Sequence, residues 1–236
     1  MNIYWSVYNI DDYFSEINYF EPENLYKREV KTNYAFEKHN DFRLCPAVRQ
    51  ELLNTFALKF PYDYSLKINR QAGTYNSDMY DQDFINHYVH AKSVEQGLLS
   101  FSVNYIFFCE EEIEASGTGA HFSENDFVKN TRFIPGRFNI GKWFRPTDCQ
   151  FLLNDDTNFI SMKRGDDWSY IKFDTNENIT LKRFFFTDKL KKIVRQNVKS
   201  KMYKTKIVSL NYWYNIFNES RQKKFILKEI KNNLME

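Results

Sequence analysis

Glycine, proline and cysteine are scarce in this chain, and each scarcity excludes a class of protein. Its 236 residues contain 7 Gly and 5 Pro, too few for a collagen-like, linker-like or disordered chain. The 3 Cys form no C-x-x-C pair, so neither a zinc ribbon nor a disulfide framework is indicated. We therefore expect a folded protein in a reducing compartment.

A long apolar run is also lacking. No stretch approaches the roughly 18 apolar residues of a membrane span, and Asp11 and Asp12 interrupt the N-terminal residues before a signal-length run develops. These features predict a cytoplasmic protein with no membrane contact. Charge of one sign is lacking as well, because 33 Lys and Arg face 31 Asp and Glu. Any electrostatic function must therefore be local.

The sequence is rich in aromatic residues, which make up 18% of the chain, and in short strand-forming segments separated by turn-forming residues. Short aromatic and β-branched runs, broken about every ten residues by Asn, Asp, Gly or Pro, extend to about residue 186. Period-two alternation predicts half-buried strands over 62–68 and 98–108. Further strands are predicted over 127–133, 138–144, 149–153, 159–163 and 168–173. The regular spacing favours a mainly β (α+β) fold, an antiparallel sandwich or distorted barrel.

The composition changes after residue 186. Apolar residues at helical spacing predict helices over 188–204, 209–217 and 219–234, and basic residues outnumber acidic ones about three to one from residue 182 onward. We therefore divide the chain into a β domain, residues 1–186, and a basic helical extension, residues 187–236. The first helix is expected to dock on the β domain. The helix from Phe225 to Leu234 is expected to contact a protein partner or a second copy.

The densest candidate for ligand binding lies between Arg132 and Leu153, where cationic and aromatic residues alternate. Such a mixture contacts phosphates and stacked bases, but the net charge of +2 gives little support for nucleic-acid binding. A buried strand pair, with arginines extending over aromatic faces, explains the same pattern. The candidate ligand-binding residues are Arg132, Arg137, Lys142, Trp143 and Arg145.

The small residues from Ser116 to Gly119 form the one glycine cluster of the sequence. Neither G-x-G-x-x-G nor the P-loop motif is present, and Glu110, Glu111 and Glu112 precede the cluster and would repel an anion. The cluster is therefore read as a connection between strands rather than a phosphate-binding loop.

Histidine and carboxylate spacing permits one alternative. His39 and Asp41 have the H-x-D form of the facial triad of iron oxygenases, which His121 would complete. Arg132 follows at the distance where 2-oxoglutarate enzymes carry the cation that pairs with the co-substrate carboxylate. The alternative cofactors are therefore Fe(II) and 2-oxoglutarate. Against this, His39 lies in the polar stretch EKHND, which is typical of a solvated turn.

A set of short motifs resembles an uncharacterised family of phage and bacterial proteins, a domain of unknown function. The motifs are CPA at 45–47, GLLSFSVNYIFF, the small residues at 116–119, IPGRFNIGKWFRP and FISMKRGDDWSYIKF. They extend over residues 45–173. The resemblance implies a β fold and a phage context and assigns no catalytic residue.

Together these observations favour a non-catalytic binding or structural protein without a cofactor, encoded by a phage or a phage-like element and located in the host cytoplasm or the virion. A mononuclear Fe(II)/2-oxoglutarate oxygenase is the alternative function.

Overall fold

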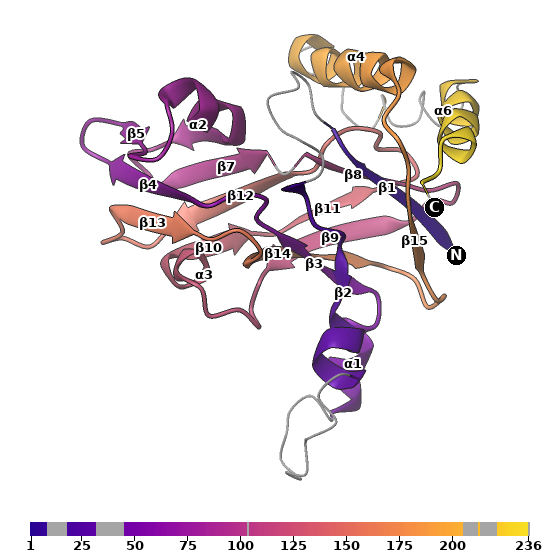
Figure 1. Cartoon of the computed structure of the whole chain (residues 1–236), viewed down its shortest axis with the longest axis horizontal. Coiled ribbons are helices and arrows are strands. Elements are labelled where there is room, and N and C mark those ends of the chain that lie inside the picture. Colours follow the sequence, from indigo (N-terminus) through magenta and orange to yellow (C-terminus); the bar gives the residue numbers. More distant parts are fainter. Residues whose placement is uncertain (9–17, 32–44, 103, 205–211, 213–220, 236) are drawn as a thin grey trace.

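The computed structural model describes residues 1–8, 18–31, 45–102, 104–204, 212 and 221–235. Over these residues the fold is mainly β with antiparallel sheets, as predicted, and helices at the C-terminal end (Figure 1). None of the sheets closes into a barrel, because each has two free edges among the described strands.

Two larger sheets form the centre of the molecule. The five-stranded sheet has the order β11 (Gly136–Asn139), β9 (Glu114–Gly119), β14 (Asp167–Phe173), β3 (Thr55–Lys59) and β2 (Glu23–Asn24). The four-stranded sheet has the order β10 (Thr131–Ile134), β12 (Asp148–Leu153), β7 (Leu98–Ser102) and β6 (Val89–Ser93). All their pairings are antiparallel.

Two three-stranded sheets and the helices complete the fold. One sheet is β15 (Thr180–Arg183), β1 (Asn2–Val7) and β8 (Tyr105–Phe108), with β1 and β15 parallel; the other is β13 (Phe159–Met162), β4 (Tyr64–Asn69) and β5 (Thr74–Asn76). The helices are η2 (Tyr26–Lys31), α1 (Pro46–Leu52), α2 (Gln82–Tyr88), α3 (Asp126–Asn130), α4 (Asp188–Lys204) and α6 (Arg221–Asn232).

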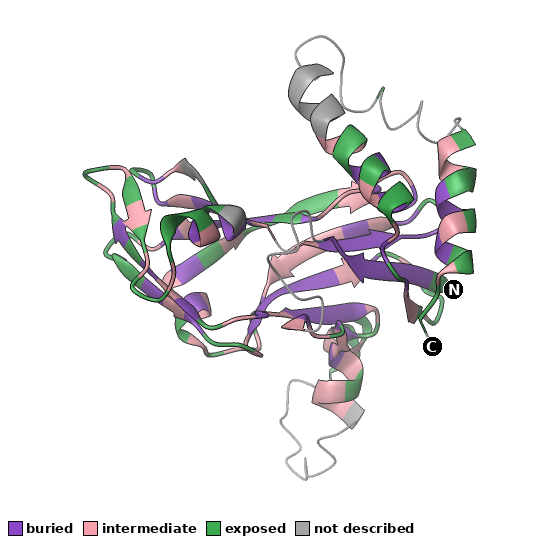
Figure 2. Ribbon diagram, turned by 45° about the horizontal axis from the view of Figure 1, so that its top comes forward, coloured by how far each residue is buried: buried purple, intermediate pink, exposed green. Residues whose placement is uncertain are grey.

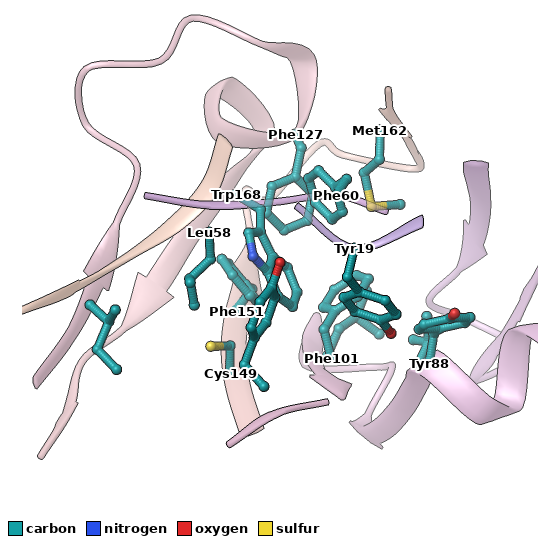
Figure 3. Packing of buried hydrophobic residues seen from close by; sticks show 14 of the residues in the cluster. Tyr19, Leu58, Phe60, Tyr88, Phe101, Phe127, Cys149, Phe151, Met162 and Trp168 are labelled. Carbon is teal, nitrogen blue, oxygen red and sulfur yellow. The ribbon is translucent and has the colours of Figure 1, made fainter. Parts of the chain in front are cut away.

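Aromatic side chains fill the space between the sheets (Figure 3). Phe101 from β7 makes edge-to-face contacts with Phe127, Phe151 and Trp168, at ring-centroid distances of 5.5, 5.6 and 6.1 Å. Such contacts add to the free energy gained by burying apolar area. The aromatic content of the sequence is thus largely core.

The prediction of one continuous strand over 98–108 is wrong. The chain forms β7 and then β8, which belong to different sheets. Between them Asn104 adopts a left-handed backbone conformation with φ 57°, which ends a strand and turns the chain. Leu99, Phe101, Tyr105 and Phe107 are all buried, as alternation predicts, and Val103 lies outside the described residues.

Two later predictions also need correction. The stretch 127–133 begins as α3, because the side chain of Asn125 accepts a hydrogen bond from the amide of Val128 at 2.9 Å and caps the helix. The stretch 138–144 is a strand only to Asn139, after which the chain turns. The predicted strands over 149–153, 159–163 and 168–173 are confirmed as β12, β13 and β14, and the strand over 62–68 as β4, which begins at Tyr64.

The C-terminal helices α4 and α6 are confirmed, and both pack on the β15–β1–β8 sheet. Alternate residues of β1 face opposite ways: Ile3, Trp5 and Val7 enter the main core, whereas Tyr4 and Tyr8 pack with the helices. This sheet is therefore buried on both faces, with the central core on one side and the helices on the other (Figure 2). The helix predicted over 209–217 lies outside the described residues except for Tyr212.

The helix from Phe225 to Leu234 was expected to remain free for a partner, and its apolar side is not free. Ile226, Leu227 and Ile230 are buried in the cluster that α6 shares with α4 and the sheet. Phe225 is 43% exposed and Leu234 38%. Because the apolar side docks within the chain, a partner would have to contact the side of α6 that faces solvent.

Candidate ligand-binding cavity

A cavity of about 460 Å³ lies between the two larger sheets, where the chain passes from one to the other. Strand β10 is an edge strand of the four-stranded sheet and β11 an edge strand of the five-stranded sheet. Pro135 joins them, and residues on both sides of it line the cavity. Proline has no amide hydrogen to donate. It suits this position because the residue lies at the edges of both sheets, where no neighbouring strand needs a donor. The volume is within the range of small-molecule sites.

Glycine shapes one wall of the cavity. The cluster Ser116–Gly119, which we expected to be a connection, is the second half of strand β9 and pairs with β11 and β14. A Cβ atom added at Gly117 would lie 2.9 Å from the ring of Phe133, closer than packing allows. The absence of a side chain at Gly117 therefore lets the Phe133 ring of β10 pack directly on β9, and both residues line the cavity. The glycines permit this close packing and do not form a loop.

The second wall is formed by Phe138 of β11 and by the loop between β11 and β12, which carries Trp143 and Arg145. The guanidinium carbon of Arg145 lies 3.4 Å from the centroid of the Trp143 ring, a cation–π contact. The Phe138 ring lies 5.6 Å from Trp143 and is tilted by 42°. Arg145, Trp143 and Phe138 all line the cavity, so two aromatic rings and one cation gather at this wall.

The same loop is held from behind by α4. Phe144, between Trp143 and Arg145, is buried in the helix cluster and packs on Phe108 at 5.1 Å. The side-chain amide of Asn197 in α4 donates a hydrogen bond to the carbonyl of Phe144 at 3.1 Å. The loop begins at Gly141, where an added Cβ would lie 2.2 Å from the carbonyl oxygen of Glu111. These contacts fix the loop, so the position of Trp143 and Arg145 depends on the C-terminal helix.

The structure separates the five residues predicted to bind a ligand. Arg137, Trp143 and Arg145 line the cavity. Arg132 is exposed on β10 and is not part of the lining, and Lys142 turns away to an ion pair with Glu112 at 2.6 Å. The alternation of cations and aromatics is therefore only partly a shared site, because Arg132 and Lys142 lie outside the lining.

The charge of Arg137 is largely compensated. Its guanidinium pairs with Asp174, and its Nε lies 3.8 Å from a carboxylate oxygen of Glu114. Arg145 is less exposed and lies over an aromatic ring. Arg145 is therefore the better placed of the two cations to meet an anionic group inside the cavity.

The lining also has hydroxyl, carboxylate, thiol and amide groups that the sequence analysis did not single out. They are contributed by Thr147, Asp148, Cys149, Gln150 and Ser169. The Tyr170 ring faces the other side of β14, where it contacts His121 and Phe122. Burial raises the pKa of the Cys149 thiol to about 12, so this thiol stays protonated at neutral pH and is a weak hydrogen-bonding group in the cavity. Only the pairing of β12 with β7 and of β14 with β3 and β9 brings them here, and no local motif signals it.

The residues predicted as iron ligands are not brought together by the described part of the chain. His39 and Asp41 lie outside the described residues. His121 is exposed after β9, its Nδ1 lies 2.9 Å from the carbonyl oxygen of Gly119, and its ring packs on Phe122 and Tyr170. Among the residues that the structure describes, no three His, Cys, Asp or Glu side chains gather as a metal site. The oxygenase alternative therefore stays a prediction.

Comparison with known proteins gives no family. No family model, no curated protein and no solved structure matches this chain. The resemblance to a phage and bacterial family of unknown function stays a prediction. In the described ranges, no helix has both the length and the apolar character to cross a membrane.

Proposed function

We propose that this chain is a non-catalytic binding protein that holds a small, flat, anionic ligand in the cavity between its two larger sheets. The observation that carries the proposal is the gathering of Arg145, Trp143 and Phe138 at one cavity wall. Flat rings bind flat ligands by stacking, and the guanidinium adds attraction for a carboxylate or phosphate.

The chemistry of the lining supports binding rather than turnover. Cys149 is kept protonated by burial, and no histidine is present among the described residues that line the cavity. A nucleophile needs an adjacent base to be activated. The lining supplies apolar walls with a few polar groups, which is the usual composition of a site that selects a ligand by shape and orientation.

We also propose a phage origin and a structural role in a virion. The support for both is the sequence resemblance over residues 45–173.

Thermal shift and calorimetric titration with a panel of nucleoside monophosphates test the proposal. We expect at least one of them to stabilise the protein, because a ligand that binds the folded state at about 100 times its Kd adds about 2.7 kcal/mol. Trp143→Ala should weaken binding by about 1–3 kcal/mol through lost stacking, and Arg145→Gln should weaken it through the lost charge.

Arg132→Gln is the matched control, since Arg132 is an exposed arginine of β10 outside the lining. It should bind as the unmodified protein does. Equal losses for Arg132→Gln and Arg145→Gln, or no binding from the whole panel, would contradict the proposed site.

A further inference from the structure

The C-terminal helices concentrate positive charge on one face of a molecule that is almost neutral overall. From Asp188 to Val198 and from Arg221 to Asn232 there are nine Lys and Arg but only two Asp and Glu. Both helices cover the same side of the β15–β1–β8 sheet (Figure 1). The net charge of +2 therefore conceals a strongly basic helical face.

The two acidic residues leave this face with an excess of positive charge, and ion pairs connect the helices to each other and to the β body. Glu229 accepts a hydrogen bond from Thr187 at 3.1 Å and lies 3.6 Å from Lys189, which joins the start of α4 to α6. On the other side of α6, Lys231 pairs with Glu110 of the β body at 2.9 Å. These contacts fix the helices against each other and against the sheet, so the remaining cations are held on a rigid support.

Three cations on the solvent side of α6 have no ion pair with a described residue. Arg221, Lys224 and Lys228 are exposed and are separated by three and four positions, so they are neighbours on one helix face. Phe225 lies within the same group and is 43% exposed. An exposed aromatic ring surrounded by cations combines the two groups that bind a single-stranded nucleic acid, one for stacked bases and one for phosphates.

The apolar sides of the helices are already occupied, which argues against a membrane surface as the partner. Leu190, Ile193 and Val194 of α4 and Ile226, Leu227 and Ile230 of α6 are buried on their own sheet. An amphipathic helix binds a bilayer by inserting its apolar side. In these two helices that side is not available.

We propose that the solvent side of α6, formed by Arg221, Lys224, Phe225 and Lys228, binds single-stranded nucleic acid without sequence preference. The site is separate from the cavity and does not depend on the proposed ligand. Phosphates pair with the three cations, and one base stacks on the Phe225 ring. Because phosphate contacts release counterions, binding weakens steeply as salt rises.

Fluorescence anisotropy with a labelled oligothymidylate of about 20 nucleotides, measured over a series of salt concentrations, tests this site. The triple variant Arg221→Gln, Lys224→Gln and Lys228→Gln should reduce the slope of log K against log salt by about 2, since each phosphate contact on a single strand contributes about 0.7. Phe225→Ala should weaken binding about fivefold to a hundredfold, the equivalent of one lost base stack.

The control triple is Lys67→Gln, Lys129→Gln and Lys163→Gln, which removes three exposed cations from β4, α3 and the turn after β13. It makes the same change in net charge, and its salt slope should match that of the unmodified protein. Circular dichroism confirms that each variant is folded. Equal loss in both triples, no binding at low salt, or unchanged binding by Phe225→Ala would overturn the proposal.

A competition arm separates nucleic acid from an acidic protein surface. Poly-glutamate at equal charge concentration should displace the oligonucleotide only in part, because it competes for the three cations but offers no flat base to Phe225. Full displacement by poly-glutamate would assign the face to acidic polypeptides instead and would overturn the proposal. Nucleoside monophosphate binding in the cavity should be unchanged in the α6 triple, so failure of one site is distinguishable from failure of the other.

Discussion

At the scale of single residues, burial controls the chemistry of the thiols. Cys109 and Cys149 are buried and Cys45 is exposed, and burial raises the pKa of each buried thiol to about 12. A thiolate reacts far faster than a thiol, so a buried and protonated sulfur is inert. Sequence position does not distinguish these three cysteines; their surroundings do.

We therefore expect an aromatic disulfide reagent to titrate one thiol in the native protein and all three in urea. Cys45→Ser should leave none that reacts rapidly in the native state, whereas Cys149→Ala should leave the fast phase intact. Rapid reaction of all three thiols without urea would contradict the burial of Cys109 and Cys149.

The same shifts give stability a definite pH dependence. Each buried thiol keeps its proton to about pH 12, and Tyr19 does so as well because burial raises its pKa to about 12. In the unfolded chain a thiol releases its proton near pH 8.5–9 and a phenol near 10. Above these values the folded state binds more protons, so the free energy of unfolding falls as pH rises from about 9 toward 12.

Urea midpoints measured between pH 7 and 10.5 should show this fall, and the double variant Cys109→Ala, Cys149→Ala should show a shallower one. A midpoint that is constant or rises over this interval would contradict it.

At the scale of elements, one residue divides the predicted strand over 98–108 into β7 and β8. Asn104 turns the chain between β7 and β8, its side-chain amide donates to the Tyr19 hydroxyl at 3.0 Å, and its carbonyl accepts from the amide of Tyr8 at 2.7 Å. Asparagine tolerates the left-handed conformation better than most residues with a side chain. The turn places Phe101 and Tyr105 in different sheets around the same core.

Two substitutions at this position separate backbone conformation from the lost hydrogen bond. Asn104→Ala and Asn104→Gly both remove the amide, but only alanine keeps a Cβ in the left-handed region. We expect the alanine variant to be less stable than the glycine variant by about 1 kcal/mol in denaturant melts. Equal stability, or greater stability of the alanine variant, would show that φ at Asn104 is not held positive.

At the scale of the whole molecule, the C-terminal helices are a structural layer and not an appendage. They cover the outer face of the β15–β1–β8 sheet, and the amide of Asn197 holds the loop that carries Trp143 and Arg145. The last residues also join the sheet edge, because Leu234 bridges Phe184 and the amide of Met235 donates to the carbonyl of Arg183 at 2.9 Å. Helices α4 and α6 therefore stabilise the β body, and α4 positions one wall of the cavity.

Neighbouring residues of α6 test this layer. Ile226 is fully buried and Phe225 is largely on the solvent side, so Ile226→Ala should lower the free energy of unfolding by about 2–5 kcal/mol, whereas Phe225→Ala should change it by about 0.5 kcal/mol or less. Both are measured by urea denaturation of the full chain. A large effect of Phe225→Ala, or a small one of Ile226→Ala, would show that α6 does not dock with this face.

The sequence by itself determined the β class, the change to basic helices and many of the buried positions. Period-two alternation found Tyr64, Leu66 and Ile68, and helical spacing found Leu190, Ile193 and Val194, because local periodicity records which side of an element meets the core. It also found Arg137, Trp143 and Arg145 through their alternation with aromatic residues.

Tertiary structure alone decided the rest. A single left-handed residue divided one predicted strand between two sheets, and pairing with β11 and β14 made the glycine cluster part of a strand. The grouping of Arg145 with Gln150 and Ser169, from three separate segments, depends on strand pairing between residues far apart in the chain. The burial of Ile226 depends on which sheet α6 meets. Long-range pairing and docking of this kind leave no periodic trace in the sequence, because periodicity reports only whether a side is buried and not what buries it.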